Sequence, residues 1–572
     1  MGTSDGLTRR EFVRAAGRSA AAAGLGLLGA PALAQAAAAA ERRPNILFLL
    51  SDDHSYPFLS CYGNTNVRTP HLDRLAAEGM KFHRCFTAAP QCVPSRAAFL
   101  TGRSPVAARI TRFSSPLPRD EITFPELLRQ QAGYFVGVCG RTYHLDGSGG
   151  RGDDGKVFNE LLQKHGLKTF SERLDYVNTG SDSVAVTQMA EFLDRRPAEK
   201  PFCLWLNFSD PHHPWNAAAE APDPAALMLP AHWPDLPGLR RQLADYCGEV
   251  NRLDGAVQRV LDLLAQRGLA ETTLVVFCGD NGLALPHGKG SLYDPGLNVP
   301  LLVRWPGVVK PGGESRALVS GEDLAPTLLA AAGVPPPERM SGVSFLPLLR
   351  GESFTGRAVV FAERGPHGSA PVSASMKNSG YDLSRCVRSE RHKFIYNCTP
   401  WIPYAPVDTA GGPAWQEISA AHAAGTLAPG LVATYFTTPR PVYEFYDLDA
   451  DPSELNNLSG TPDVAAAERE LRQALTEKMV VDFDYLPLPD LGLRPPEAAA
   501  DASPAEVEKR RAADFRRKDS DGDGRLSPAE FGASREPADA AKWFGLRDAN
   551  GDGFVSREEF LPGAPLTKPA AK

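Results

Sequence analysis

The chain has 572 residues, of which 43% are hydrophobic, and its formal net charge is −7 at pH 7. This length suggests about three domains with large apolar cores, and the negative charge argues against a nucleic-acid-binding protein. The nine cysteines are scattered and do not form a disulfide framework. Cys139, Cys203 and Cys278 lie in apolar, strand-like runs and are expected to be core thiols. Cys386 and Cys398 are close enough in sequence to pair, which the sequence alone leaves open.

The first 34 residues are typical of an export signal. The segment Thr8-Arg9-Arg10-Glu11-Phe12-Val13 resembles a twin-arginine motif, an alanine-rich apolar run follows, and Ala32-Leu33-Ala34 fits a cleavage site. A transmembrane anchor is the alternative, although glycines and an arginine interrupt the run. We therefore expect export by the twin-arginine translocase to the bacterial periplasm or beyond, with no membrane span in the mature form.

Between residues 43 and 355, short apolar runs alternate with helical patterns. This alternation predicts an α/β domain whose largely parallel sheet is covered by helices. One clear helix is expected near residues 253–264, where apolar side chains recur at three- and four-residue spacing, and it should stop by Gly268. The expected strands are Ile46–Leu50, Phe135–Cys139, Phe202–Phe208, Leu274–Cys278 and Leu301–Val303.

The pattern of apolar and polar residues changes in the C-terminal part of the chain. From about residue 356 to residue 485, alternating and turn-rich segments such as Cys386–Tyr396 and Tyr443–Leu448 predict a smaller antiparallel domain. Residues 486–503 are rich in proline, alanine and acidic side chains and are expected to be a linker. A last module is expected over residues 504–565.

The strongest functional signal is the string Cys-Val-Pro-Ser-Arg-Ala-Ala-Phe-Leu-Thr-Gly at residues 92–102. Pro94 suits the start of a helix and Gly102 suits its end, so Cys92 is expected at the mouth of a short helix. A helix N-terminus attracts anions, and Arg96 adds a fixed positive charge one turn inside. Cys92 in this setting is a candidate nucleophile for an anionic ester, although a lone cysteine is more often a buried structural thiol.

Polar side chains follow four of the predicted strands. Open α/β sheets bind ligands beyond the carboxyl ends of their strands, so these side chains should converge. The acidic and amide members supply hard oxygen ligands that suit Ca²⁺ or Mg²⁺, whereas an isolated Asp-Asp pair is more often a turn or a cap. They are Asp52 and Asp53 after the first strand, Arg141 and His144 after the second, His212 after the third, and Asp280 and Asn281 after the fourth.

The string at residues 92–102 resembles the signature of the sulfatase family, Cys-x-Pro-Ser-Arg followed by Leu-Thr-Gly. The resemblance implies an α/β, alkaline phosphatase-like domain with a large mixed sheet flanked by helices, followed by a smaller antiparallel α+β subdomain. It also implies that a formylglycine-generating enzyme oxidises Cys92 to formylglycine. One calcium ion would bind the modified Cys92, Asp52, Asp53, Asp280 and Asn281. Further matching motifs, spread over roughly residues 43–490, are Thr69–Ala76, Asp210–His212, Asp280–Gly282, Asp323–Leu328 and Tyr446–Leu448.

The resemblance also implies a mechanism, in which the aldehyde hydrate attacks sulfur, His212 protonates the leaving group and His144 removes the second hydroxyl proton. Gly140–His144 resembles the family's Gly-Lys-x-His element, with Arg141 in place of the usual lysine and one extra residue before His144. The segment around Lys289, Leu285–Tyr293, is similar to the heparan N-sulfatase branch, and His287 is a weaker candidate beside it. The catalytic set is thus Cys92, Arg96, Arg141, His144, His212 and Lys289.

The expected substrate is a sulfated carbohydrate, with the sugar and the choice between N-sulfate and O-sulfate left open. Two alternatives remain at this stage. One is a phosphate or phosphonate ester hydrolase of the same fold. The other is a non-catalytic, calcium-dependent glycan-binding protein.

Two acidic loops near the C-terminus match the EF-hand pattern. Phenylalanines stand before and after each loop (Phe515, Phe531, Phe544 and Phe560) and should pack the two helix–loop–helix units together. A dockerin-like partner module is the weaker alternative. We expect up to two calcium ions here, independent of catalysis. Their ligands are Asp519, Asp521, Asp523, Arg525 and Glu530 in the first loop, and Asp548, Asn550, Asp552, Phe554 and Glu559 in the second, with Arg525 and Phe554 acting through backbone carbonyls.

Overall fold

The computed structural model describes residues 43–112, 117–142, 160–166, 170–367, 380–491, 504–533 and 537–561. The chain forms two compact units, Met1–Pro489 and Asp490–Lys572, which are considered separately. The expected export signal and His144 lie outside the described residues. Within those residues, no helix is both long and apolar enough to cross a membrane.

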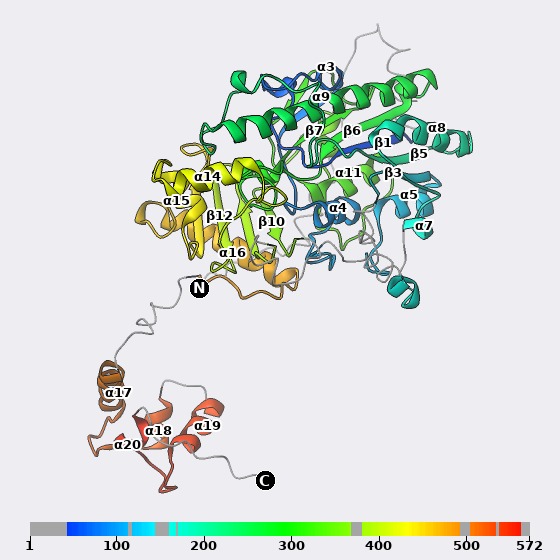
Figure 1. Cartoon of the computed structure of the whole chain (residues 1–572). Helices are drawn as coiled ribbons and strands as arrows, with labels where there is room; N and C mark the ends of the chain where they lie inside the picture. Colours follow the sequence, from blue (N-terminus) through cyan, green and yellow to red (C-terminus); the bar gives the residue numbers. More distant parts are fainter. Residues whose placement is uncertain are drawn as a thin grey trace, which may run out of the picture. The chain divides into compact units, whose positions relative to one another are not determined.

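The first unit is built on a nine-stranded sheet (Figure 1). Its strand order is β4-β3-β5-β1-β6-β7-β2-β8, with β9 paired to β2. The strands are β1 (Asn45–Ser51), β2 (Met80–Phe86), β3 (Phe135–Gly140), β4 (Tyr176–Thr179), β5 (Phe202–Asn207), β6 (Thr273–Gly279), β7 (Asn298–Arg304), β8 (Gly313–Ser315) and β9 (Val319–Ser320).

The sheet is mixed, as the family resemblance implied. Strands β4, β3, β5, β1 and β6 are parallel, whereas β7 runs antiparallel to both β6 and β2. All five apolar runs named from the sequence are strands. Strand β2 was missed because its sequence, Met-Lys-Phe-His-Arg-Cys-Phe, alternates apolar and polar side chains and contains no continuous apolar run.

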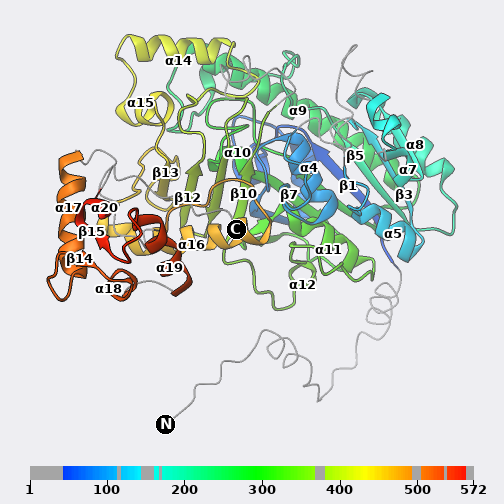
Figure 2. The same ribbon diagram turned by 90° about the horizontal axis from the view of Figure 1, so that it is seen from below.

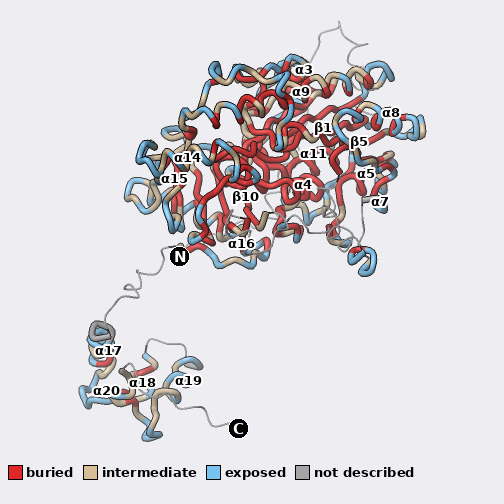
Figure 3. Tube along the Cα trace, in the orientation of Figure 1, coloured by how far each residue is buried: buried red, intermediate tan, exposed pale blue. Residues whose placement is uncertain are grey.

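Helices cover both faces of this sheet, which is why its central strands read as continuous apolar runs. On β1, Phe48 and Leu50 pack in the core that includes α4, α5 and α11, while Leu47 and Leu49 pack in the core that includes α3, α8 and α9. Figure 3 shows this burial concentrated along the central strands. These helices are α3 (Pro70–Ala77), α4 (Cys92–Thr101), α5 (Phe124–Ala132), α8 (Ala185–Arg195), α9 (Pro237–Gln266) and α11 (Leu324–Ala331).

The helix expected near residues 253–264 is the C-terminal part of α9, which is 30 residues long. Its N-terminal part packs Leu239, Leu243 and Val250 into a separate apolar cluster away from the sheet core. The shorter elements of this domain are η1 (Ser60–Tyr62), α7 (Phe170–Arg173), η2 (Asp182–Val184), η3 (Pro224–Ala226), η4 (Ala270–Thr272), α10 (Asp294–Leu297), η5 (Gly321–Asp323) and α12 (Leu346–Leu349).

The antiparallel subdomain is a four-stranded sheet in the order β10-β11-β12-β13. One face packs Val387 and Phe394 against α16, and Figure 2 shows α16 beside these strands. The other face packs Cys386 and Ile395 against Phe86 of the large sheet, so the two sheets share a core. Cys386 and Cys398 are both free thiols. The elements are β10 (Val360–Arg364), β11 (Ser384–Arg388), β12 (His392–Asn397), α14 (Pro413–Ala423), α15 (Pro429–Phe436), β13 (Tyr443–Asp447), η7 (Pro462–Val464) and α16 (Ala465–Val481).

The second unit contains two helix–loop–helix segments. Strands β14 and β15 pair antiparallel, with Leu526 opposite Val555. The four expected phenylalanines join these two residues in one small apolar cluster. The elements are α17 (Pro504–Lys518), β14 (Arg525–Leu526), α18 (Pro528–Gly532), α19 (Pro537–Arg547), β15 (Val555–Ser556) and α20 (Arg557–Phe560).

Candidate active site

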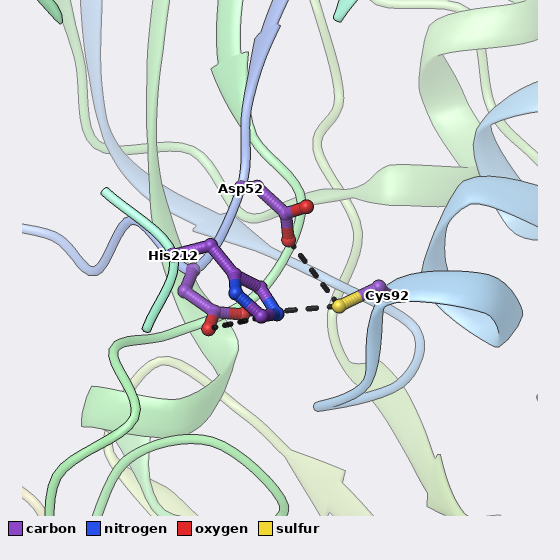
Figure 4. Close-up of side chains that lie close together, drawn as sticks. Asp52, Cys92 and His212 are labelled. Carbon is purple, nitrogen blue, oxygen red and sulfur yellow. Dashed lines mark hydrogen bonds and ion pairs between the residues drawn. The ribbon is translucent and has the colours of Figure 1, made fainter. Parts of the chain in front are cut away.

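Cys92 is the first residue of α4 and is fully buried. Its Sγ lies 3.3 Å from Asp52 Oδ1 and 3.8 Å from Asp53 Oδ1. Figure 4 shows the thiol directed at the Asp52 carboxylate beside the ring of His212. The helix ends as the sequence predicts, because Gly102 adopts a left-handed φ of 64°. Cys92 therefore stands at the positive end of a helix dipole and faces two carboxylates.

The acidic groups meet because β1 and β6 are parallel neighbours. Ser51 pairs with Gly279 at the ends of these strands, so Asp52 and Asp280 leave the sheet side by side. The backbone N–H of Asp53 donates to Asp280 Oδ1 at 2.9 Å. All three carboxylates are completely buried. The convergence at the carboxyl edge of the sheet is the arrangement expected from the sequence.

Two arginines bind this carboxylate cluster. Arg96 lies 3.0 Å from Asp52 Oδ2 through Nη2 and 2.9 Å from Asp280 Oδ2 through Nε. Arg141 Nε lies 2.7 Å from the same Asp52 Oδ2. Arg141 thus brings its positive charge into the cluster despite replacing the lysine of the family pattern. A planar guanidinium directs its N–H groups in a fixed fork, whereas an ammonium is a compact point charge.

Lys289 and His212 lie on the other side of Asp53. Lys289 Nζ is 2.9 Å from Asp53 Oδ1 and 3.2 Å from His212 Nε2. His212 Nε2 is 3.7 Å from Asp53 Oδ2. His287, the weaker candidate, lies elsewhere, in a buried aromatic stack 3.9 Å from the ring of Tyr293. Of the predicted catalytic residues, the structure brings together Cys92, Arg96, Arg141, His212 and Lys289.

Three further residues of the site, Asp408, His367 and Gln91, were not predicted from the sequence. Lys289 Nζ lies 2.7 Å from Asp408 Oδ2, and Asp408 Oδ1 lies 3.4 Å from His367 Nε2. The ring of His367 is in turn 3.1 Å from Gln91 Nε2. Only Gln91 carried a signal, because it directly precedes Cys92. Asp408 lies in a proline-rich segment between β12 and α14 that contains no recognised motif.

Burial and charge fix the protonation states of the site. Burial, together with the Asp52 carboxylate, raises the pKa of the Cys92 thiol well above its usual value. Burial also raises the pKa of Asp280, with Asp52 adding to the effect. Burial opposes the charge on Lys289, but the carboxylates of Asp408 and Asp53 raise its pKa well above the ordinary value. Burial lowers the pKa of His212, and the positive charge of Lys289 adds to the effect.

The oxygen-rich side of the cluster fits a hard divalent cation. Asn281 donates through Nδ2 to Asp53 Oδ1 at 2.9 Å, and its own Oδ1 is buried with no hydrogen-bond partner among the described residues. A buried, unpartnered amide oxygen beside buried carboxylates is a typical calcium ligand. Ligand atoms of Asp52, Asp53, Cys92 and His212 also lie within 4.8 Å of one another.

A cavity of about 470 Å³ adjoins the cluster. Arg141 and His212 form part of its wall, so a group bound there would touch the catalytic cluster directly. Another part of the wall is braced by Asp210, whose carboxylate accepts hydrogen bonds from Arg252 at 2.7 and 2.8 Å. Most residues that line the cavity have polar side chains, and the others among them include Ser181, Asp182, Ser209, Asn216, Glu249 and Arg259.

The two C-terminal loops also fit calcium. In the first loop, oxygens of Asp519, Asp521 and Asp523 lie within 4.8 Å of one another, and Asp519 Oδ1 is buried with no hydrogen-bond partner in the described part of the chain. Glu530 and Glu559 are oriented by capping boxes with Ser527 and Ser556. Arg525 and Phe554 occupy position seven of their loops. Arg525 is the first residue of β14, and Phe554 directly precedes β15.

Comparison with known proteins agrees with this geometry. The family model "Sulfatase" matches residues 44–334, and the model "EF hand" matches residues 512–533 and 540–561. An ulvan-active sulfatase of Formosa agariphila is 28% identical over 472 residues, covering 78% of this chain and 76% of the relative. Human N-sulphoglucosamine sulphohydrolase is 28% identical over 479 residues, covering 76% of this chain and 90% of the human protein.

Among solved structures, BT4656 in complex with its substrate D-glucosamine-2-N,6-O-disulfate matches with a TM-score of 0.57 at 22% identity. The match covers 78% of this chain and 99% of that chain. This similarity shows a common fold, which confirms the alkaline phosphatase-like architecture expected from the motifs. The chain therefore belongs to the sulfatase family, whose named members are sulfuric ester hydrolases, and it carries EF hands in its C-terminal unit.

Proposed function

We propose that this protein is a calcium-dependent sulfatase that removes sulfate from a sulfated glycan and uses formylglycine at position 92. The observation that carries the proposal is the position of Cys92 at the N-terminus of α4, within 3.8 Å of two buried carboxylates. Arg96, Arg141 and Lys289 surround the same carboxylates. This site combines oxygen ligands for a cation with positive charges for an anionic ester.

The charge balance supports a sulfate ester. The four carboxylates of Asp52, Asp53, Asp280 and Asp408 exceed by one the positive charges of Arg96, Arg141 and Lys289. These seven side chains thus carry a net charge of −1, and a bound divalent cation would change the net charge of the site to +1. A sulfate monoester carries a single negative charge and neutralises that excess, whereas a doubly charged phosphate monoester would overshoot it. Buried charge is costly when unbalanced, so the balance favours a sulfate monoester over a phosphate monoester.

In the proposed mechanism, the residues of the site have separate roles. Oxidation of Cys92 to formylglycine would supply an aldehyde whose hydrate offers one hydroxyl to attack sulfur and a second whose deprotonation releases sulfate. A divalent cation bound by Asp52, Asp53, Asp280 and Asn281 would lower the pKa of the attacking hydroxyl.

Lys289 and Arg141 would stabilise negative charge on the sulfuryl oxygens. His212 lines the cavity where the leaving group would sit and would protonate it. His144 is proposed as the base that removes the second hydroxyl proton, on the family resemblance.

The cavity and the relatives support a substrate class. We assign the cavity beside Arg141 and His212 to a single terminal sugar, since hydrogen-bonding side chains line it and it meets the cluster at one side. The similarity to human N-sulphoglucosamine sulphohydrolase supports a sulfated amino sugar.

We also propose twin-arginine export, conversion of Cys92 by a formylglycine-generating enzyme, and up to two calcium ions in the EF hands. The proposed domain limits are 43–355, 356–485 and 504–565, with a linker at 486–503.

Two measurements test the proposal. Mass spectrometry of the peptide containing Cys92, from protein made in its native host, should show the thiol replaced by an aldehyde. Release of sulfate from sulfated oligosaccharides should then exceed release of phosphate from matched esters with the same leaving group. Full retention of the thiol together with full sulfatase activity would refute the formylglycine mechanism.

The same measurements separate the two remaining alternatives. An equal or greater efficiency on phosphate or phosphonate esters would assign the site to that chemistry, which the same fold can support. An unmodified Cys92 with calcium-dependent glycan binding and no turnover would identify a binding protein.

A further inference from the structure

Lys289 is held between two carboxylates that come from different parts of the chain. Its Nζ lies 2.9 Å from Asp53 Oδ1 and 2.7 Å from Asp408 Oδ2, and its side chain is 1% exposed. Asp53 follows the first strand of the large sheet, whereas Asp408 lies in the segment between β12 and α14 of the antiparallel subdomain. The antiparallel subdomain thus contributes a charged group to the active site.

The ammonium of Lys289 uses all of its hydrogen-bonding capacity. An ammonium has three N–H donors, and the partners of Lys289 are Asp53, Asp408 and His212, the last at 3.2 Å. A sulfate oxygen can bind Lys289 only when one of these contacts is released. Asp53 has a competing role, because it accepts the Asn281 amide and belongs to the oxygen cluster that fits a cation. Asp408 is then the contact that keeps the ammonium in place.

Asp408 is itself held in a defined position. Its φ is 65°, a left-handed conformation that is uncommon for residues other than glycine, although aspartate adopts it more often than most. His367 Nε2 lies 3.4 Å from Asp408 Oδ1, and Gln91 Nε2 lies 3.1 Å from the other ring nitrogen of His367. Gln91 is the N-cap of α4. A chain of side-chain contacts therefore links the start of the helix that carries Cys92 to the ammonium of Lys289.

We propose that Asp408 is a positioning residue, which holds the Lys289 ammonium where the sulfuryl oxygens bind, so that the antiparallel subdomain completes the active site. This inference rests on the proposed sulfatase function, since it takes Lys289 as a sulfate-binding group. Asp408 acts through Lys289 and needs no contact with sulfur or the leaving group.

The test is a double-mutant cycle in the full-length protein with position 92 converted. Asp408→Asn and Lys289→Met, alone and together, are compared by kcat and KM for sulfate release from 4-nitrophenyl sulfate. The calorimetric Kd for inorganic sulfate is measured for the same four proteins. We expect each single variant to lower kcat by about 10²-fold, the scale for losing one oriented charge donor. The double variant should lose no more than the larger single effect, because the two residues act as one unit.

Three further variants serve as controls or replacements. Asp408→Glu keeps the carboxylate and should recover most of the lost kcat. Asp449→Asn, which alters a 71% exposed carboxylate near Arg391, should change neither kcat nor the sulfate Kd. If Asp408→Asn does not fold, Asp408→Ser takes its place in the cycle.

Additive losses in the double variant, or an unchanged kcat and sulfate Kd for Asp408→Asn, would overturn the inference. Sulfate binding requires no turnover, so the cycle on Kd decides the inference even for a wild-type protein that releases no sulfate. A wild-type protein that releases no sulfate would refute the proposed sulfatase function but would leave the inference about Asp408 to be decided by sulfate binding.

Discussion

The active site and the EF hands both gather acidic side chains, but they build their sites in opposite ways. Asp52, Asp280 and Asp408 belong to segments more than a hundred residues apart, and they meet in a cluster in which the carboxylates of Asp52 and Asp280 are fully buried. The candidate calcium ligands of each EF-hand loop come from twelve consecutive residues, and Asp521 and Asp523 are exposed. The first site can form only in the folded chain, whereas the second is a local unit.

The difference predicts different energetic costs. A buried charge that loses its partner remains desolvated, so breaking a buried ion pair is expensive, while an exposed pair is worth little. The active-site cluster should therefore respond strongly to single substitutions in both activity and stability. Substitutions in the EF-hand loops should affect calcium binding in that unit alone.

The largest expected effect is at the nucleophile. Cys92→Ala removes the side chain that would carry the covalent step, so sulfate release should fall by at least about 10⁴-fold, as for other enzymes that lose their nucleophile. Since Cys92 is small, the melting temperature should change little. Steady-state kinetics and differential scanning calorimetry measure the two quantities. Wild-type turnover by this variant would remove Cys92 from the mechanism.

The next effect concerns stability. Arg96→Ala leaves Asp52 and Asp280 without a shared guanidinium in a completely buried site, and it should destabilise the catalytic unit by about 3–5 kcal/mol. The matched control is Arg267→Ala, whose ion pair with Asp194 is exposed, and which should cost less than about 1 kcal/mol. Chemical denaturation of both variants measures the difference. Equal losses would show that burial does not distinguish these pairs.

Acid should weaken the catalytic unit more than the EF-hand unit, which contains no histidine. Burial lowers the pKa of His232 to about 3, whereas an unfolded histidine titrates near 6.5. The unfolded chain therefore binds a proton that the folded chain rejects, so stability falls as pH drops below about 6.5. The slope is about 1.4 kcal/mol per pH unit for this group.

Calorimetry between pH 7 and pH 5 measures this slope. His232→Phe should remove the contribution of one proton from the slope of stability against pH. His165→Phe, which changes an exposed histidine, should leave this slope unchanged. An unaltered slope in His232→Phe would assign the acid sensitivity to other groups.

The smallest expected effect on turnover comes from the EF hands. Glu530→Gln combined with Glu559→Gln removes the carboxylate at position twelve of each loop, and calorimetric titration should lose up to two calcium equivalents. Turnover on 4-nitrophenyl sulfate should stay at the wild-type level. Truncation after Leu491 should behave in the same way. A parallel loss of activity and melting temperature would show instead that the C-terminal unit braces the catalytic one.

The features that the sequence predicted well are local in the chain. The helix that starts at Cys92 and ends at Gly102 depends on residues within one short segment, and so do the two EF-hand loops. Five of the nine strands of the large sheet were predicted, because helices cover both faces of the sheet and make these strands continuous apolar runs. Strand β2 was missed because its polar side chains alternate with apolar ones, and the same alternation would suit a surface strand elsewhere.

The amino-acid sequence alone identifies the chemical groups that this protein has available: a cysteine at a helix N-terminus, acidic and amide side chains at strand ends, and two loops of the EF-hand pattern. Which charges face one another depends on the tertiary structure. Arg96 bridges Asp52 and Asp280 because β1 and β6 are adjacent, and Asp408 reaches Lys289 because the antiparallel subdomain shares a core with the large sheet. Such contacts depend on strand order and on the packing between subdomains, which no local pattern encodes.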